Sequence, residues 1–192
     1  MSIRLGILGI GSMGRHHVRN ARATAGVDLV ALADPGGDRF GVAGDLPVLG
    51  GVEELIEAGI DAAIIAAPTA HHEAAALALA EAGVHTLVEK PLATSVEAGA
   101  RIRDAFAAAG LVGAVGYVER CNPALIDMRR RIADGQLGAI EQIATRRQSP
   151  FPARISDVGV VKDLATHDVD LAAWVAGAPY ESIYARTSAR SG

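Results

Sequence analysis

Short apolar runs alternate with alanine-rich stretches of helical period through the first 120 residues of the chain. Runs rich in Val, Ile and Leu that stay apolar on both faces are typical of a parallel sheet, because helices cover both faces of such a sheet. The pattern therefore predicts an α/β fold with a doubly wound parallel sheet. The expected strands span 3–9, 27–34, 61–68, 85–90 and 112–118, and the expected helices span 12–24, 52–59, 71–83 and 95–110.

Local signals mark the ends of several of these helices. Thr94 and Glu97 have the spacing of a capping box at the start of the last helix. Gly83 and Gly110 stand where two helices should end. The segment between Asp34 and Val52 is short and rich in glycine, so any helix in it must be abbreviated.

The pattern changes after residue 120, and we place a domain boundary there, between 1–120 and 121–192. The expected elements of the second part are helices over 122–138 and 160–177 and strands over 139–149 and 180–189. The two strand segments alternate between apolar and polar residues, as half-exposed strands do. Two strands make only a marginal sheet, so we predict an incomplete α/β domain.

Composition and charge narrow the possible function classes. The net charge is −4 and no long basic block occurs, so nucleic acid is not an expected partner. No apolar run reaches the roughly 18 residues that a bilayer span needs, and the N-terminus lacks the pattern of a signal peptide. The single cysteine, Cys121, permits no internal disulfide and is expected to be half-buried. These features predict a cytoplasmic protein without a membrane partner.

The segment GIGSMG places Gly9, Gly11 and Gly14 in G-x-G-x-x-G spacing, directly after a predicted strand and at the start of a helix. A dinucleotide-binding loop requires this context, because the glycines allow a tight turn, a close pyrophosphate and close helix packing. Asp34 ends the next strand, where a carboxylate accepts hydrogen bonds from ribose hydroxyls and repels a 2′-phosphate. NAD is therefore expected before NADP. Arg39 could soften that preference or be an ordinary surface residue.

Two other interpretations of the loop stay open at this point. One is a purely structural turn followed by an ordinary aspartate at a strand end. The other is a methyltransferase that uses S-adenosylmethionine, since such enzymes have a similar loop and acidic residue.

A second motif, LVEKPLATS, follows the apolar run of another predicted strand. Ligands of doubly wound sheets bind beyond the carboxyl ends of the strands, so Glu89 and Lys90 should face the same crevice as Gly11. An ammonium there would stabilise negative charge that develops on a substrate oxygen. Glu89 could anchor Lys90 or contact the nicotinamide ribose, and Pro91 restricts Lys90 to extended geometry. Alone, the tripeptide could equally be structural.

A third motif, KDLATHDVD, places Asp163 and His167 on one face of a predicted helix. A carboxylate can orient an imidazole and raise its basicity, and histidine is a natural proton acceptor. The alternative is a surface pair without function. We expect Trp174 to pack in the core, and His16 and His17 to pack or face solvent. No His, Cys and Asp set has metal-ligand spacing, so no metal is expected.

The segments GIGSMGRHH, AAPTAHHEAAALALAEAGVHTLVEKPLATS and DLATHDVDLAAW resemble the glucose–fructose oxidoreductase/inositol dehydrogenase/MocA (Gfo/Idh/MocA) family. The resemblance implies a Rossmann domain followed by an α/β domain with an open-faced, mainly antiparallel sheet. It implies NAD(P)-dependent hydride transfer at a secondary hydroxyl of a sugar, cyclitol or nucleotide sugar. It assigns the family's catalytic lysine to Lys90, a contact with the substrate hydroxyl to Asp163, and the general base or acid to His167.

Cofactor contacts are expected from Gly9, Ile10, Gly11, Ser12, Met13, Gly14, Asp34, Ala67, Pro68, Thr69, His72, Glu89 and Lys90. Substrate contacts are expected from Lys90, Tyr117, Arg120, Asn122, Asp163 and His167. The stretches VERCNPAL and SPFPARISDVGVVKDLATHD look more like the UDP-N-acetylglucosamine 3-dehydrogenase branch than the inositol dehydrogenases. Arg146, Arg147 and Arg154 could then hold a diphosphate, or they could be solubilising charges.

The resemblance also implies a longer chain, because family members continue well past residue 192. An unfinished sheet exposes an unpaired edge, so we expect a homo-oligomer formed through the C-terminal sheet. The alternative to an active dehydrogenase is a catalytically inactive or truncated module for NAD binding or assembly.

Overall fold

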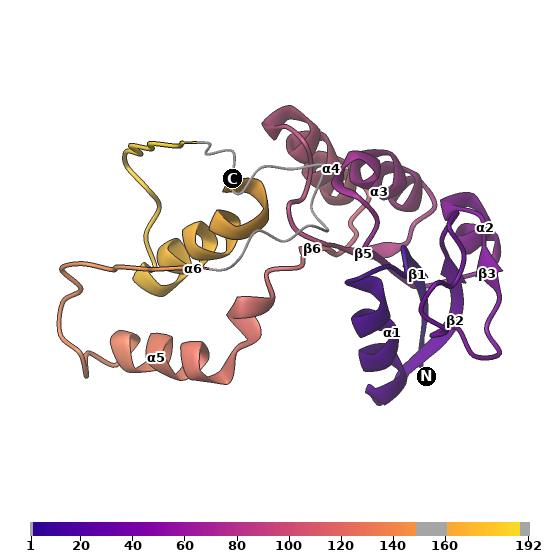
Figure 1. The fold of residues 1–192 in the computed structure, drawn as a ribbon, viewed down its shortest axis with the longest axis horizontal. Coiled ribbons are helices and arrows are strands. Elements are labelled where there is room, and N and C mark those ends of the chain that lie inside the picture. The colour runs from indigo at the N-terminus through magenta and orange to yellow at the C-terminus, as the bar shows by residue number, and fades with distance from the viewer. Residues whose placement is uncertain (1, 149–160, 189–192) are drawn as a thin grey trace. The chain divides into compact units, whose positions relative to one another are not determined.

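The computed structural model describes residues 2–148 and 161–188. Their contacts divide them into two compact units. The first unit consists of residues 2–116, and the second consists of residues 117–148 and 161–188. Figure 1 shows a sheet flanked by helices in the first unit, and helices over 123–133 and 166–176 in the second.

Six parallel strands form the sheet of the first unit, in the order β3-β2-β1-β4-β5-β6. They are β1 (Ile3–Leu8), β2 (Val27–Ala33), β3 (Val48–Leu49), β4 (Ala62–Ile65), β5 (His85–Val88) and β6 (Gly113–Val115). The strand order reverses between β1 and β4, and such a reversal opens a crevice at the carboxyl ends of the strands. The doubly wound sheet and its five predicted strands are confirmed, whereas the two-residue β3 was not predicted.

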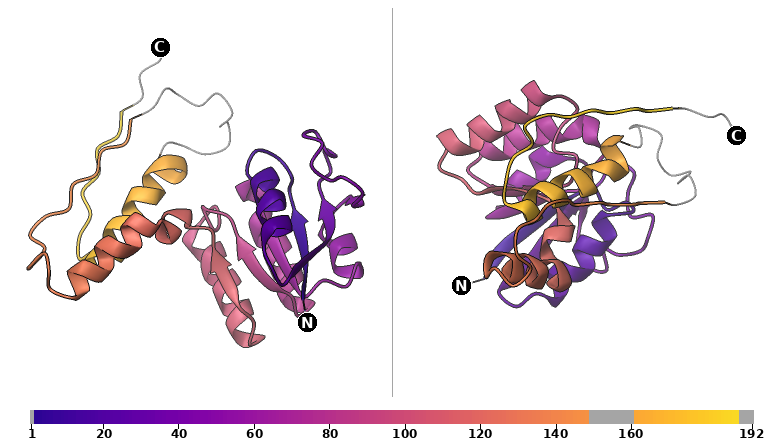
Figure 2. Two further views of the ribbon diagram at one scale, coloured as in Figure 1. Left: turned by 90° about the horizontal axis from the view of Figure 1, so that it is seen from below. Right: turned by 90° about the vertical axis from the view of Figure 1, so that its left-hand side faces the viewer.

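Helices cover both faces of this sheet, as Figures 1 and 2 show. They are α1 (Gly14–Ala23) on one face, and α2 (Val52–Glu57), α3 (His72–Glu81) and α4 (Val96–Ala108) on the other. Val18 of α1 belongs to one buried cluster with Ile7 and Leu32 of the sheet. Leu79 of α3 and Phe106 of α4 belong to a second cluster. The two apolar faces of the strands therefore explain both layers of helices.

The helix ends follow local chemistry. Ser95 caps α4, because its hydroxyl oxygen accepts a hydrogen bond from the Ala98 N–H at 3.2 Å. The cap expected at Thr94 is therefore wrong by one residue. Gly83 and Gly110 follow α3 and α4 with φ of 78° and 68°, which glycine adopts without a Cβ clash. Both helices end where the sequence predicted.

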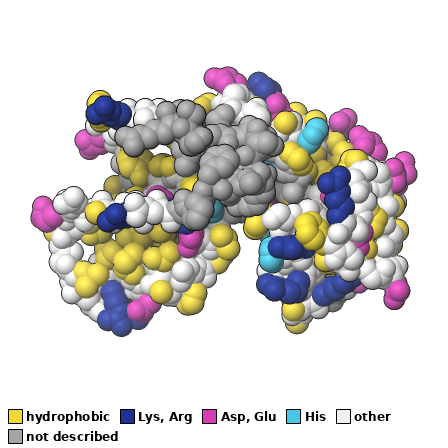
Figure 3. All heavy atoms as spheres, in the orientation of Figure 1, with side chains coloured by type: hydrophobic (Ala, Val, Ile, Leu, Met, Phe, Trp, Pro, Cys, Tyr) yellow, Lys and Arg dark blue, Asp and Glu magenta, His cyan; other side chains and the backbone are white. Residues whose placement is uncertain are grey.

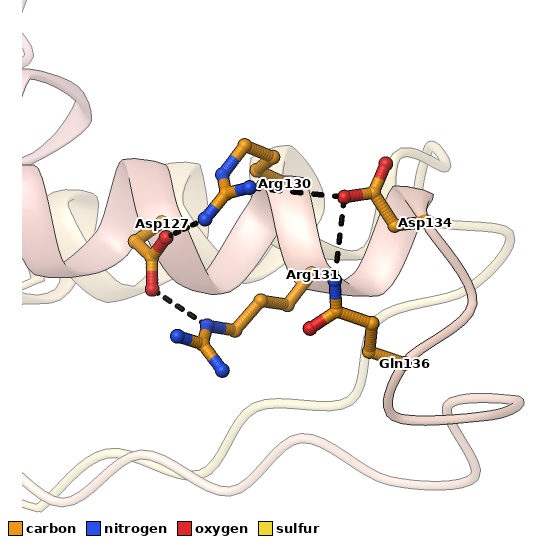
Figure 4. Close-up of polar contacts among 5 residues, drawn as sticks. All are labelled: Asp127, Arg130, Arg131, Asp134 and Gln136. Atoms are coloured by element: carbon orange, nitrogen blue, oxygen red, sulfur yellow. Dashed lines mark hydrogen bonds and ion pairs between the residues drawn. The ribbon is translucent and has the colours of Figure 1, made fainter.

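The second unit is built on α5 (Pro123–Ala133) and α6 (Thr166–Ala176). A short 3-10 helix, η2 (Val118–Cys121), precedes α5, and a short π-helix, η3 (Val161–Ala165), precedes α6. On α5, the Asp127 carboxylate binds both Arg130 and Arg131 (Figure 4). Arg130 also lies 3.9 Å from Asp134, one turn further along. Pairs at this spacing give an exposed helix modest support, because solvent screens them.

The two strands expected in this unit are not present in the part that the structure describes. Residues 139–148 and 181–188 form no ladder, so the strand prediction is wrong for them. An alternating pattern becomes a strand only where a neighbour supplies hydrogen bonds, and neither segment has one among the described residues. The segment 150–159, between the first of these predicted strands and the second predicted helix, lies outside the described residues. Hydrophobic side chains gather on the visible face of this unit (Figure 3).

Candidate cofactor and catalytic site

The glycine loop connects β1 to α1 at the point where the strand order reverses. Gly9 has φ of 85°, and a Cβ there would lie 2.6 Å from the backbone nitrogen of Ala67. A Cβ on Gly14 would lie 1.8 Å from the carbonyl oxygen of Gly9. A Cβ on Gly11 would meet no atom of the described residues within 4 Å. The loop is therefore tight at both ends and open in the middle, which is the shape that receives a pyrophosphate.

Asp34 holds this loop against the end of β2. Its Oδ2 accepts a hydrogen bond from the Ile10 N–H at 3.0 Å, and its Oδ1 accepts one from the Gly36 N–H at 2.8 Å. The carboxylate is half-buried and lines the cleft beside the loop. A carboxylate oxygen has more than one acceptor position, so Asp34 can bind ribose hydroxyls while it keeps both backbone contacts.

The cleft has a volume of about 900 Å³ and lies wholly within the first unit. Seven of the predicted cofactor residues line it: Gly9, Gly11, Ser12, Met13, Asp34, Ala67 and Pro68. Arg39, Phe40 and His71 also line it, of which Phe40 and His71 were missed. The Arg15 guanidinium lies 4.7 Å from the Phe40 ring centroid. A lone aromatic residue in a glycine-rich segment was the available signal for Phe40.

His72 and Thr69 are buried rather than placed along this cleft. The His72 Nε2 lies 2.8 Å from the Ala67 carbonyl oxygen, and its Nδ1 lies 3.0 Å from that of Pro91. The imidazole thus ties the turn after β4 to the segment after β5. These contacts make His72 a residue that fixes the cleft wall. Ile10 is likewise buried, and its N–H serves Asp34.

The glutamate–lysine–proline segment follows β5, with a cis bond between Lys90 and Pro91. Glu89 is buried, and its Oε1 accepts a hydrogen bond from Nε2 of His17 at 2.7 Å. Its Oε2 accepts one from the Lys90 N–H at 3.1 Å. Burial alone would raise the pKa of Glu89, but the His17 hydrogen bond and charge, with the N–H and charge of Lys90, hold it below its usual 4.5.

His17 is the functional candidate that the sequence reasoning missed, since packing or solvent exposure was expected for it. A signal was available, because His17 follows Gly14 by three residues and shares a helix face with it. Gly14 packs against the loop, so the same face points toward the carboxyl ends of the strands.

The second unit carries the other predicted catalytic residues. Asp163 lies in η3 and His167 in the first turn of α6, in one continuous helical segment. The His167 side chain is half-buried, and the Asp163 side chain lies outside the described part. Arg154, one of the three predicted diphosphate ligands, is also outside it. The backbone thus places Asp163 and His167 four residues apart in one helical segment.

The predicted substrate residues at the start of this unit have structural partners. The Arg120 guanidinium binds both oxygens of Asp170, at 2.8 and 2.5 Å, and lies 5.5 Å from the Tyr117 ring centroid. Burial, and secondly the charge of Asp170, raise the pKa of the Tyr117 hydroxyl. Asn122 caps α5 through its Oδ1, which accepts a hydrogen bond from Ala124 N–H at 3.0 Å. These contacts hold η2, α5 and α6 together.

Other expectations for this unit meet mixed outcomes. Arg147 binds Asp168 at 2.9 Å and Glu119 at 3.5 Å, so its charge is already balanced by two carboxylates. Cys121 is exposed, which corrects the expected half-burial. It sits in the short exposed turn η2, where little packs over it. Trp174 is half-buried, with the Arg129 guanidinium 4.5 Å from its ring centroid.

The structure describes residues 2–148 and 161–188. Within these ranges, no three His, Cys, Asp or Glu side chains are grouped so that they could hold a metal ion. No helix in the same ranges has the length and apolar character that crossing a membrane requires.

The chain is similar to several proteins named as dehydrogenases of inositols or of UDP-N-acetylglucosamine. The chain is 31% identical to inositol 2-dehydrogenase 2 of Saccharopolyspora erythraea, over 100% of this chain and 59% of that protein. It is 33% identical to scyllo-inositol 2-dehydrogenase (NAD(+)) of Bacillus subtilis, over 94% and 56%. The solved structure of UDP-N-acetylglucosamine 3-dehydrogenase from Acidithiobacillus ferrooxidans matches with a TM-score of 0.80 and 30% identity, over 92% and 57%. The chain thus spans little more than half the length of these relatives.

Two family profiles match the chain in succession. Residues 3–117 match the profile described as an oxidoreductase family with an NAD-binding Rossmann fold. Residues 125–192 match the C-terminal domain profile of the same family. The first match covers the sheet, the glycine loop and the glutamate–lysine–proline segment described above. The chain therefore belongs to the Gfo/Idh/MocA oxidoreductase family, with its NAD-binding Rossmann fold in residues 3–117.

Proposed function

We propose that this protein is an NAD-dependent dehydrogenase that oxidises a secondary hydroxyl of a sugar, cyclitol or nucleotide sugar. The observation that carries the proposal is the glycine cradle beside Asp34, in one unit with Glu89 and Lys90. The open space at Gly11 and the half-buried carboxylate of Asp34 fit a dinucleotide. The relatives act, by their names, on inositols or on UDP-N-acetylglucosamine, which gives the substrate class.

Alcohol oxidation removes a hydride from carbon and a proton from oxygen. Bound NAD supplies the hydride acceptor. The imidazole of His167 takes the hydroxyl proton, and Asp163 binds a substrate hydroxyl. The Lys90 ammonium stabilises the negative charge that grows on the oxygen as the proton leaves. This division of roles requires Lys90, Asp163 and His167 to act on one substrate.

The proposal keeps NAD as the preferred cofactor over NADP. Asp34 would carry a negative charge toward the ribose hydroxyls and so repel a 2′-phosphate. Arg39 lines the same cleft, with its Nε 3.4 Å from the Gly36 carbonyl oxygen. Its guanidinium is the group in this cleft that would bind the 2′-phosphate of NADP.

The test combines binding with turnover. NADH is titrated against the purified chain by fluorescence, and NADH production is then measured with a panel of inositols and UDP-sugars. We expect micromolar binding and turnover of at least one substrate, with Lys90→Met losing about 10²–10⁴ in kcat and little NADH affinity. A Lys90→Met variant with wild-type turnover would refute the role of Lys90.

A module that binds NAD without catalysis is the second candidate. It is favoured by the unpaired segments 139–148 and 181–188, which form no substrate-binding sheet among the described residues. NADH binding without turnover of any panel member would select this candidate. Binding of S-adenosylmethionine in place of NADH would instead revive the methyltransferase interpretation.

A further inference from the structure

Glu89 is a buried carboxylate that follows β5, and a hydrogen-bond donor faces each of its two oxygens. Its side chain retains about 10% of its exposed surface. One oxygen faces Nε2 of His17 at 2.7 Å, and the other faces the main-chain N–H of Lys90 at 3.1 Å. A buried charge is costly unless it is paired and hydrogen-bonded, and both oxygens of Glu89 meet that requirement.

The space around Glu89 is also reserved for it. A Cβ on Gly116 would lie 3.0 Å from the carboxyl carbon and from Oε2 of Glu89, and 3.1 Å from Oε1. A side chain at this position would make the carboxylate shift by a few tenths of an ångström. Gly116 follows β6, so the segment after the neighbouring strand shapes the pocket of the carboxylate.

His17 connects Glu89 to a helix that is distant in sequence. It lies in α1, the helix that begins at the glycine loop, and is 72 residues from Glu89 along the chain. An ionised carboxylate can only accept, so His17 Nε2 donates the hydrogen bond. The pair therefore joins the helix of the cofactor loop to the residue that precedes Lys90.

We propose that His17 and Glu89 are positioning residues for Lys90, because the hydrogen bonds from His17 and from the Lys90 N–H to the Glu89 carboxylate hold the main chain from which the Lys90 amine extends. The proposal deepens the function given above and rests on it, since it explains how Lys90 is held ready for its role. The titratable groups that act on the Glu89 carboxylate are His17 from α1 and Lys90 beside it, while Gly116 adds none.

The composition of the chain offers a direct readout. Lys90 and Lys162 are its only lysines, so trace acetylation with acetic anhydride has two side-chain amine targets. The reagent must reach the amine, so the labelling of Lys90 relative to Lys162 reports how accessible the Lys90 amine is. Mass spectrometry of the two peptides gives this ratio, and no turnover is needed.

Glu89→Gln keeps the size of the side chain and removes its charge. We expect the ratio of Lys90 to Lys162 labelling at pH 8 to rise about three- to tenfold, because a weakened hydrogen bond to the Lys90 N–H loosens this segment and opens the amine to the reagent. Glu73→Gln is the matched control, since it removes a surface carboxylate that binds Arg101 at 2.6 Å. It should leave the ratio unchanged. Equal ratios in the wild type and both variants would overturn the proposal.

A second pair of variants covers the case in which Glu89→Gln does not fold. His17→Ala removes the donor and should raise the labelling ratio in the same direction, whereas His17→Gln keeps an N–H and should restore it. A His17→Ala ratio equal to the wild type would contradict the proposal. A wild type without turnover would refute the proposed function, yet the labelling ratios would still decide this inference.

Discussion

At the scale of single residues, the three loop glycines are required for different reasons. Packing demands Gly9 and Gly14, because a Cβ at either would lie within 2.6 Å of backbone atoms. Packing does not require Gly11, because in the part of the chain that the structure describes no atom lies within 4 Å of a Cβ built there. Only a ligand that approaches the backbone can require a glycine there.

This difference predicts two separable losses. Gly11→Ala should change the free energy of unfolding by less than about 0.5 kcal/mol, yet weaken NADH binding at least about tenfold. Gly14→Ala should lower the free energy of unfolding by about 1–3 kcal/mol, because the loop or α1 must shift. Chemical denaturation and NADH titration of both variants measure this. Full NADH affinity in Gly11→Ala would show that the open space is not a cofactor cradle.

Asp34 is expected to set the cofactor preference. Asp34→Asn removes the negative charge and keeps an acceptor oxygen for one of the two backbone contacts, with the Ile10 N–H or the Gly36 N–H. The ratio of NADP to NAD affinity should rise about tenfold or more, since a hydrogen bond to a charged group contributes roughly 1.5–3 kcal/mol. Titration with both reduced cofactors gives the ratio. An unchanged ratio would remove Asp34 from cofactor selection.

At the scale of elements, the bridge between His17 and Glu89 fastens α1 to the end of β5. Neither residue type nor spacing reveals such a contact, because its partners are 72 residues apart and meet only in the folded sheet. The sheet was predictable, since each strand is a continuous apolar run. The two-residue β3 was not, because Val48 and Leu49 are too few to show a period.

The bridge also predicts a dependence of stability on pH. The pKa of Glu89 is lowered on folding, so its contribution to stability is fully present above about 4.5 and is lost as the pH falls through the lower folded value. Glu89→Gln should therefore be less stable than the wild type at neutral pH, and the difference should shrink below pH 4.5. Denaturation across this range measures it. A difference that does not change with pH would contradict the role of the charge.

At the scale of the whole molecule, the sequence predicted the first unit better than the structure of the second unit. The glycine loop could be predicted because its motif lies directly between the strand and the helix that flank it in the sequence. The strands expected over 139–149 and 180–189 could not be, because a strand depends on a partner that the pattern of one segment does not specify. The predicted homo-oligomer through this part stays a prediction.

The proposed chemistry joins groups from both units, Lys90 from the first and His167 from the second. Two residues that serve one proton-transfer step have non-additive effects when both are removed. When two groups act independently, the factors by which their single variants lower kcat/KM multiply in the combined variant.

The decisive measurement is therefore a double-mutant cycle on kcat/KM for NAD-dependent oxidation, with Lys90→Met, His167→Asn and the combined variant. If Lys90 and His167 act on the same substrate hydroxyl, the combined variant should be about as slow as the slower single variant, with NADH affinity preserved in all three. Losses that multiply, or wild-type turnover in either single variant, would contradict a shared site.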